Sequence, residues 1–348
     1  MLPEEVLFVA RNELLSWHST GISIMEVSHR SEEFKQVVEE SQHDIRNLLA
    51  IPENYQVLFL QGGARLQFSM VPMNLLETHK KAVYIASGVW SELAIEEAKI
   101  YCDVYLAADA KNLCYTGIPD QAEWDLPDNA DYFYYVDNET VNGIEFHCIP
   151  DTSLPLICDM SSNLLSRSSD VSRYGLVFAC AQKNLGLAGL TLVIVREDLL
   201  GRKPLPLTPS YLRYSLHAKN YSLLNTPPTF AWYMSGLVFK WLKEQGGIEV
   251  IEKQNKRKAD KLYAAIDKSD FYHNTIDPRY RSRMNIIFTL VDENLNELFL
   301  KEAAKHGLVN LKGHRLLGGM RASIYNAMPE KGIDALTAFM RKFEKQYG

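Results

Sequence analysis

Cysteine is scarce and unpatterned in this chain of 348 residues. The five cysteines are odd in number, show no C-x-x-C spacing and lie mostly within apolar segments. This usage argues against a disulfide framework and against a structural zinc site, and it is typical of reduced thiols in a cytoplasmic protein. We therefore expect neither disulfides nor a metal site.

Long apolar runs and an excess of basic residues are also missing. No apolar stretch approaches the roughly 20 residues of a membrane-spanning helix, and the start, Met1-Leu-Pro-Glu-Glu-Val6, does not resemble a signal peptide. Lysine and arginine number 37 against 43 acidic residues, giving a net charge of -6. This balance argues against a nucleic-acid or membrane-surface partner, both of which need a basic face. We expect a cytoplasmic protein.

The composition that remains is that of an ordinary folded protein, 47% hydrophobic and 23% charged. Its length predicts a large domain, placed at residues 1–250, and a small one at residues 251–348. Helices are predicted over 4–15, 32–49, 66–76, 229–244, 249–266, 294–306 and 332–347, and the stretch 211–228 is loop-like. The charges of the 249–266 segment, Lys258 among them, indicate a solvated face.

Short buried strands alternate with these helices, which predicts an α/β fold with a mostly parallel sheet. The strands expected in the large domain include 57–60, 132–136, 154–159, 176–181 and 190–195, and another begins at residue 82. Ligands of such folds lie at the carboxyl ends of the strands. The residues that fall at these ends are Gly62, Gly63, Trp90, Thr140, Asp159 and Lys183.

Each of these residues has an ordinary interpretation and a chemical one. Lys183 is either a surface lysine at a strand end or an amine held near an apolar interior, as a Schiff-base lysine is. The glycine turn before Arg65 is either a tight turn or an anion cradle at a helix N-terminus, and its spacing suits a single phosphate rather than a dinucleotide. Trp90 is either core or the cover of a planar ligand. Asp159, buried at a strand tip, needs a cation.

The chemical interpretations converge on one cofactor. Lys183 as the Schiff-base amine, Asp159 as partner of a protonated pyridine nitrogen, a phosphate cradle at residues 63–65 and Trp90 as an aromatic cover describe a site for pyridoxal 5'-phosphate (PLP). The convergence favours these interpretations over the individual ordinary ones.

Six segments, in order along almost the whole chain, resemble the phosphoserine aminotransferase family of fold-type I PLP enzymes. They are Met25-Glu-Val-Ser-His-Arg30, Gln61-Gly-Gly-Ala-x-Leu-Gln67, Asp159-Met-Ser-Ser162, Ala181-Gln-Lys-Asn-Leu-Gly-x-Ala-Gly-Leu-Thr191, Asn225-Thr-Pro-Pro-Thr-Phe230 and Gly313-His-Arg-x-x-Gly-Gly-Met-Arg-Ala-Ser-Ile-Tyr-Asn326. The resemblance implies a seven-stranded, mostly parallel sheet in the large domain, a small C-terminal α/β domain and a homodimer with shared active sites.

The resemblance also implies an activity and a role for each site residue. The activity is amino transfer between L-glutamate and 3-phosphohydroxypyruvate in serine biosynthesis, with the phosphohydroxythreonine step of PLP synthesis as a further reaction of some members. Lys183 would be catalytic, and PLP would be held by Ala64, Arg65, Trp90, Thr140, Asp159, Gln182, Lys183 and, from the neighbouring subunit, Asn225 and Thr226. Substrate anions would be bound by His29, Arg30, His314, Arg315 and Arg321, with Arg321 on the α-carboxylate.

Two alternatives stay open. A cysteine desulfurase or another small-substrate transaminase is one, although a desulfurase needs a mobile cysteine late in the chain and none follows Cys180. The other is a homologue that binds PLP without catalysis. It is suggested by the start at Met1-Leu2-Pro3, where family members usually carry a segment like Asn-Phe-Ser-x-Gly-Pro-Ala.

Overall fold

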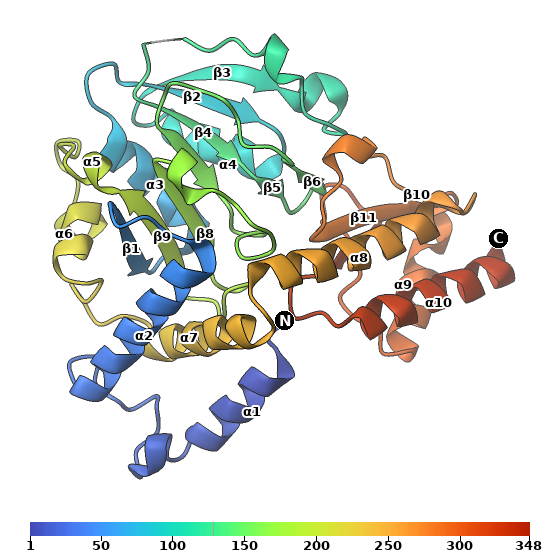
Figure 1. The fold of residues 1–348 in the computed structure, drawn as a ribbon. Coiled ribbons are helices and arrows are strands. Elements are labelled where there is room, and N and C mark those ends of the chain that lie inside the picture. The colour runs from blue at the N-terminus through green and yellow to red at the C-terminus, as the bar shows by residue number, and fades with distance from the viewer. Residues whose placement is uncertain (128) are drawn as a thin grey trace.

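A computed structural model describes residues 1–127 and 129–348. Its central feature is a sheet of seven strands in the order β1-β9-β8-β7-β4-β2-β3 (Figure 1). The strands are β1 (Tyr55–Leu60), β2 (Lys81–Ala86), β3 (Asp103–Asp109), β4 (Tyr132–Val136), β7 (Leu156–Asp159), β8 (Leu176–Cys180) and β9 (Thr191–Arg196). Strands β3, β2, β4, β7 and β8 are parallel, whereas β9 pairs antiparallel with β8 and with β1. The predicted α/β fold with a mostly parallel seven-stranded sheet is confirmed.

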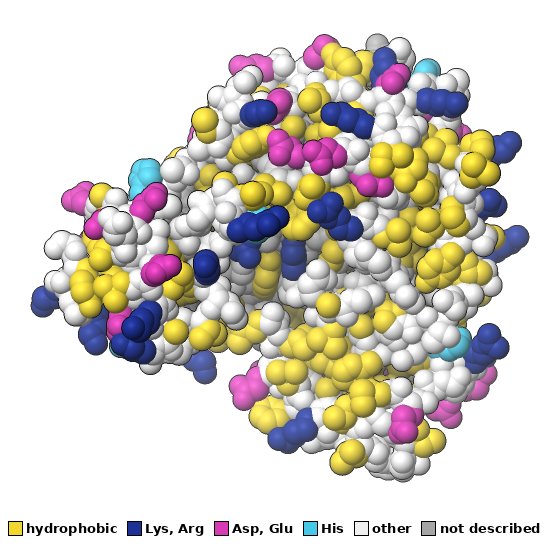
Figure 2. All heavy atoms as spheres, turned by 180° about the vertical axis from the view of Figure 1, so that it is seen from behind, with side chains coloured by type: hydrophobic (Ala, Val, Ile, Leu, Met, Phe, Trp, Pro, Cys, Tyr) yellow, Lys and Arg dark blue, Asp and Glu magenta, His cyan; other side chains and the backbone are white. Residues whose placement is uncertain are grey.

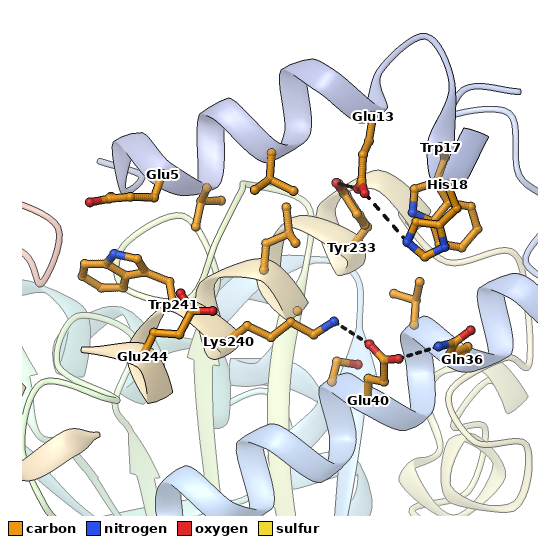
Figure 3. Close-up of a pocket in the computed structure, with 16 residues that line it drawn as sticks. Glu5, Glu13, Trp17, His18, Gln36, Glu40, Tyr233, Lys240, Trp241 and Glu244 are labelled. Carbon is orange, nitrogen blue, oxygen red and sulfur yellow. Dashed lines mark hydrogen bonds and ion pairs between the residues drawn. The ribbon is translucent and has the colours of Figure 1, made fainter. Parts of the chain in front are cut away.

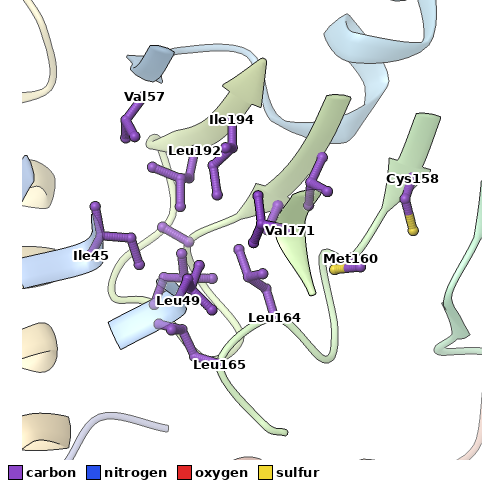
Figure 4. Close-up of a cluster of buried hydrophobic side chains, with 14 of the residues drawn as sticks. Ile45, Leu49, Val57, Cys158, Met160, Leu164, Leu165, Val171, Leu192 and Ile194 are labelled. Atoms are coloured by element: carbon purple, nitrogen blue, oxygen red, sulfur yellow. The ribbon is translucent and has the colours of Figure 1, made fainter. Parts of the chain in front are cut away.

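Helices cover both faces of this sheet because both faces are apolar. In β1, Val57 and Phe59 belong to the core shared with α2 and α7, while Leu58 and Leu60 belong to the core shared with α3 and α4. Figure 4 shows the first of these cores, where side chains of α2 meet the sheet. The helices around the sheet are α1 (Glu4–Glu13), α2 (Glu32–Leu49), α3 (Gly63–Leu75), α4 (Val89–Ala98), α5 (Glu197–Leu200), α6 (Tyr214–Lys219) and α7 (Thr229–Glu244). The alternation along β1 is the period of two expected of a strand.

A second sheet, of three antiparallel strands, lies beside the seven-stranded sheet and its helices (Figure 1). It consists of β10 (Tyr272–His273), β11 (Asn285–Leu290) and β12 (Met320–Ser323), and it packs with α8 (Ile248–Asp267), α9 (Asn296–Lys305) and α10 (Glu330–Tyr347). The predicted domain boundary between residues 250 and 251 falls in the first turn of α8. That boundary stays a prediction.

The structure corrects three details of the sequence interpretation. The helix predicted from residue 66 begins at Gly63, directly after Gly62, whose positive φ of 94° is one that glycine adopts without strain. The stretch predicted to be a loop contains α6, whose Tyr214 is buried and donates a hydrogen bond to Gln67 at 2.6 Å. Lys258 does not lie on the solvated face of α8, since only 2% of it is exposed.

Among the described residues, none of the helices combines the length and the apolar character that crossing a bilayer requires.

Candidate active site

Lys183 and two other predicted residues meet at the carboxyl edge of the large sheet. The connection between β8 and β9, residues 181–190, carries Lys183, whose Nζ donates a hydrogen bond to Thr140 Oγ1 at 2.7 Å. The same ammonium lies 5.8 Å from the centre of the Trp90 ring. Thr140 directly follows the short strand β5 (Asn138–Glu139), and Trp90 lies in the first turn of α4. Three separate strand ends thus bring an amine, a hydroxyl and an aromatic face together.

A buried glutamate fixes the position of Trp90. The Glu139 carboxylate accepts hydrogen bonds from the main-chain N–H groups of Trp90 and Ser91, at 2.9 and 2.8 Å. These are unpaired donors of the first turn of α4, where negative charge is favoured. Gly88 makes the close approach possible, because a Cβ there would lie 2.6 Å from the Glu139 carboxyl carbon. Glu139 was not among the predicted site residues, and the only sequence signal for Glu139 is its position next to Thr140.

Glu139 should make stability depend on pH. Burial raises the pKa of Glu139 from 4.5 to about 7, with the nearby Asp159 charge adding to the increase and the main-chain hydrogen bonds opposing it. Because this folded-state pKa lies above the unfolded value, the glutamate stabilises the fold fully below pH 4.5, and that contribution is lost as the pH rises through 7. Glutamine does not titrate. From pH 5 to 8, the free energy of unfolding should therefore fall by about 2 to 3 kcal/mol more for the native protein than for Glu139→Gln.

Chemical denaturation at several pH values, followed by tryptophan fluorescence, measures this difference. Glu96→Gln is the matched control, because Glu96 lies on the same helix with an exposed side chain. Stability curves of the native protein and Glu139→Gln that stay parallel across this pH range would show that Glu139 does not titrate there.

Asp159 is a buried carboxylate at the end of β7. It is 4% exposed, and its Oδ1 accepts a hydrogen bond from the Ser161 N–H at 2.8 Å. Burial raises the pKa of Asp159, while hydrogen bonds from Ser161 and the charge of Lys183 oppose the increase. A protonated pyridine nitrogen placed against Asp159 would supply the cation that burial of a carboxylate calls for. The donor set therefore fits PLP, with an amine, an anion and an aromatic face in one place.

The predicted phosphate cradle lies between β1 and α3. The N–H of Ala64 donates to Cys180 Sγ at 3.0 Å, which ties the first turn of α3 to the end of β8. A Cβ built on Gly63 would meet only that sulfur, at 3.8 Å, so the turn leaves room beside the helix N-terminus. Arg65 and Gln182 have exposed side chains. A helix N-terminus with exposed polar side chains around it can receive a phosphate.

Arg321 reaches the site from the small sheet. It lies on β12, and its Nη1 donates to the main-chain oxygen of Thr140 at 3.4 Å. Figure 2 shows Lys and Arg side chains gathered around a hollow between the parts of the molecule built on the two sheets. A guanidinium beside Thr140 and Lys183 is suited to bind a carboxylate in a bidentate manner.

The other predicted anion-binding residues do not meet within one chain. His29 and Arg30 precede α2, whose first turn lies on the side of the molecule opposite the three-stranded sheet (Figure 1). His314 and Arg315 lie in the loop before β12, a loop that needs Gly313 because a Cβ there would lie 1.9 Å from the Gly318 carbonyl oxygen.

The segment of Asn225 and Thr226 lies beside the cradle of its own chain. The carbonyl of Thr226 accepts a hydrogen bond from Gln61 at 2.9 Å, and both side chains are exposed.

A separate cavity of about 300 Å³ lies between α1, α2 and α7 (Figure 3). Its lining includes Trp17, Trp241, the ion pair of Lys240 with Glu40, and His18, whose Nε2 lies 3.8 Å from Glu13 Oε1. None of the predicted site residues lines it. The cavity is therefore not the catalytic site.

Comparison with known proteins agrees with this geometry. The model of the family described as "Aminotransferase class-V" matches residues 1–336. The chain therefore belongs to the class-V aminotransferases.

Individual relatives narrow the assignment. The phosphoserine aminotransferase of Coxiella burnetii is 71% identical over 347 residues, which cover 100% of this chain and 96% of that protein. The solved phosphoserine aminotransferase of Bacillus circulans subsp. alkalophilus superposes with a TM-score of 0.97 at 46% identity, covering 100% of this chain and 97% of that one. The PLP-bound enzyme of Trichomonas vaginalis gives a TM-score of 0.94 at 41% identity, with 98% and 97% covered. Within the class, the chain is a member of the phosphoserine aminotransferase family.

Proposed function

We propose that this chain is a PLP-dependent transaminase that moves the amino group of L-glutamate to 3-phosphohydroxypyruvate, giving O-phospho-L-serine and 2-oxoglutarate in serine biosynthesis. The observation that carries the proposal is the meeting of Lys183, Thr140 and Trp90 with Arg321 at one sheet edge. The Coxiella burnetii relative, at 71% identity over the full chain, supports the choice of substrates.

Residues of the large domain would hold the cofactor. Bound PLP supplies a ring that accepts electrons from the substrate α-carbon. The buried carboxylate of Asp159 would keep the ring nitrogen protonated, Trp90 would cover one face and Thr140 Oγ1 would bond the phenolic oxygen. The phosphate would lie in the cradle, held by Ala64, Arg65 and Gln182 and by Asn225 and Thr226 of a second subunit.

Lys183 and Arg321 would have different roles toward the substrate. Arg321 would bind the α-carboxylate in a bidentate manner and so orient the bond that breaks at the α-carbon. The Lys183 amine would then take the proton from that carbon and deliver it to the cofactor side. The hydrogen bond from Lys183 Nζ to Thr140 Oγ1 holds the amine near the Trp90 ring.

Binding of the second anionic group of each substrate would require a homodimer. His29 and Arg30 lie far from His314 and Arg315 within one chain (Figure 1). A second copy that placed one pair opposite the other would give each site a basic pocket for either the phosphate of phosphoserine or the γ-carboxylate of glutamate. This need supports a homodimer with shared active sites.

Substrate preference tests the proposal. With 2-oxoglutarate as amino acceptor, we expect kcat/KM for O-phospho-L-serine to exceed that for L-serine by about 10³-fold, because serine leaves the basic pocket unpaired. The measurement is the rate of glutamate formation from each donor. Equal values for the two donors would contradict a phosphate-binding pocket and favour a transaminase of other small substrates.

A further inference from the structure

The turn that follows β12 encloses a buried lysine ammonium. Lys258, on α8, is 2% exposed, and its Nζ donates to the carbonyl oxygens of Tyr325 and Met328 at 3.0 Å each. The carbonyl oxygens of Ile324 and Asn326 lie at 3.2 and 3.5 Å. All four acceptors are neutral main-chain groups of one turn, residues 324–328, so the ammonium is the centre around which this turn folds.

A second side chain of the same helix holds the same turn. Asn255 lies one helical turn before Lys258, and its Nδ2 donates to Asn326 Oδ1 at 2.8 Å. Asn326 in turn donates its main-chain N–H to Asn184 Oδ1 at 3.0 Å. Asn184 directly follows Lys183 in the chain. The turn therefore joins three places: the end of the strand that carries Arg321, helix α8, and the neighbour of the predicted catalytic lysine.

Keeping a charge in this position has a cost. Burial lowers the pKa of Lys258 from 10.5 to about 8, and the charge of Glu330 opposes the decrease. Without the ammonium, the carbonyls of Ile324, Asn326 and Met328 would each lose a hydrogen bond in this largely buried turn, which is unfavourable, whereas the Tyr325 carbonyl would keep the one from the Met328 N–H at 2.9 Å. The turn would then be expected to shift, and β12 would shift with it.

We propose that Lys258 is a positioning residue for the transamination, setting the separation between Arg321 and Lys183 through the 324–328 turn. The inference rests on the proposed function, in which Arg321 binds the substrate α-carboxylate. A displaced Arg321 weakens binding of every substrate that carries an α-carboxylate, whereas the cofactor contacts of the large domain stay intact.

Replacing Lys258 with methionine, which keeps the length of the stem and removes the donors, tests this role in the PLP-loaded enzyme. We expect KM for L-glutamate and for O-phospho-L-serine to rise by about tenfold each, with kcat within about twofold of the native value. The visible spectrum of bound PLP should be unchanged, and the dissociation constant of 2-oxoglutarate measured by calorimetry should rise by a similar factor. Lys256→Met is the control, since Lys256 lies on the same helix with an exposed side chain that pairs with Asp260.

The outcomes separate this inference from the proposed function. Native enzyme without transaminase activity would contradict the proposed function itself. If the native enzyme is active, two results for Lys258→Met would overturn the role of Lys258. One is an unchanged KM, and the other is a fall of kcat alone, which is what a smaller folded fraction of the variant would produce. If Lys258→Met does not fold, Asn255→Ala decides, because it removes a hydrogen bond to the same turn while the Lys258 ammonium stays paired with the turn carbonyls. A rise of KM without loss of kcat is again the expected result.

Discussion

Lys183→Ala should lower kcat for amino transfer by about 10⁴-fold. A positioned acid–base group contributes up to about this factor, and alanine leaves nothing within reach of the substrate α-carbon to carry the proton. In the structure, the Lys183 amine lies close to Thr140 and Trp90, and among the described residues only Lys183 donates a side-chain hydrogen bond to Thr140 Oγ1. The variant should still bind PLP, because Asp159, Trp90 and the phosphate cradle remain.

Stopped-flow absorption of the PLP-loaded variant, mixed with L-glutamate, measures the loss in a single half-reaction. Lys256→Ala serves as the matched control, because it removes an exposed lysine of the same length and should keep the full rate. A Lys183→Ala variant that turns over at the native rate would rule out Lys183 as the catalytic amine.

Asp159→Asn is expected to lower kcat by about 10² to 10³-fold, the usual cost of removing one preorganised charge from an active site. Asparagine keeps the size of the side chain but cannot stabilise a proton on the pyridine nitrogen by charge. Because Asp159 is 4% exposed, water cannot replace that charge effectively. The defect should lie in kcat more than in KM, since Asp159 is placed to contact the cofactor and not the substrate.

A PLP analogue methylated on the ring nitrogen separates this electrostatic effect from a packing defect. The methylated ring is positive at every pH, so it should restore part of the rate of Asp159→Asn. Asp151→Asn is the control, because the Asp151 side chain is exposed. Native activity in Asp159→Asn would contradict the role assigned to this carboxylate.

The placement of the cofactor residues could be predicted because each follows a short apolar run. Strand ends are visible in sequence, and the carboxyl ends of parallel strands share one edge, so Thr140, Trp90 and Lys183 were expected near one another and are. Glu139 could not be found in this way. Its partners are main-chain N–H groups of a helix 48 residues away, and a sequence does not show which helix start a buried carboxylate meets.

Lys258 was predicted wrongly for a related physical reason. Its neighbours on α8 are charged, and a pattern of charges indicates a solvated face. The structure buries it because a turn from β12, far along the chain, offers it four carbonyls. His29 and Arg30 do not come together with His314 and Arg315 within one chain. Their grouping stays a prediction that needs a second copy.

The most direct test of the central claim is the visible absorption of the PLP-loaded protein, recorded before and after L-glutamate and, separately, after O-phospho-L-serine. We expect a cofactor band that is lost with each amino acid and is restored when 2-oxoglutarate is added. A band that persists with both amino acids would contradict transamination and would indicate a homologue that binds PLP without catalysis.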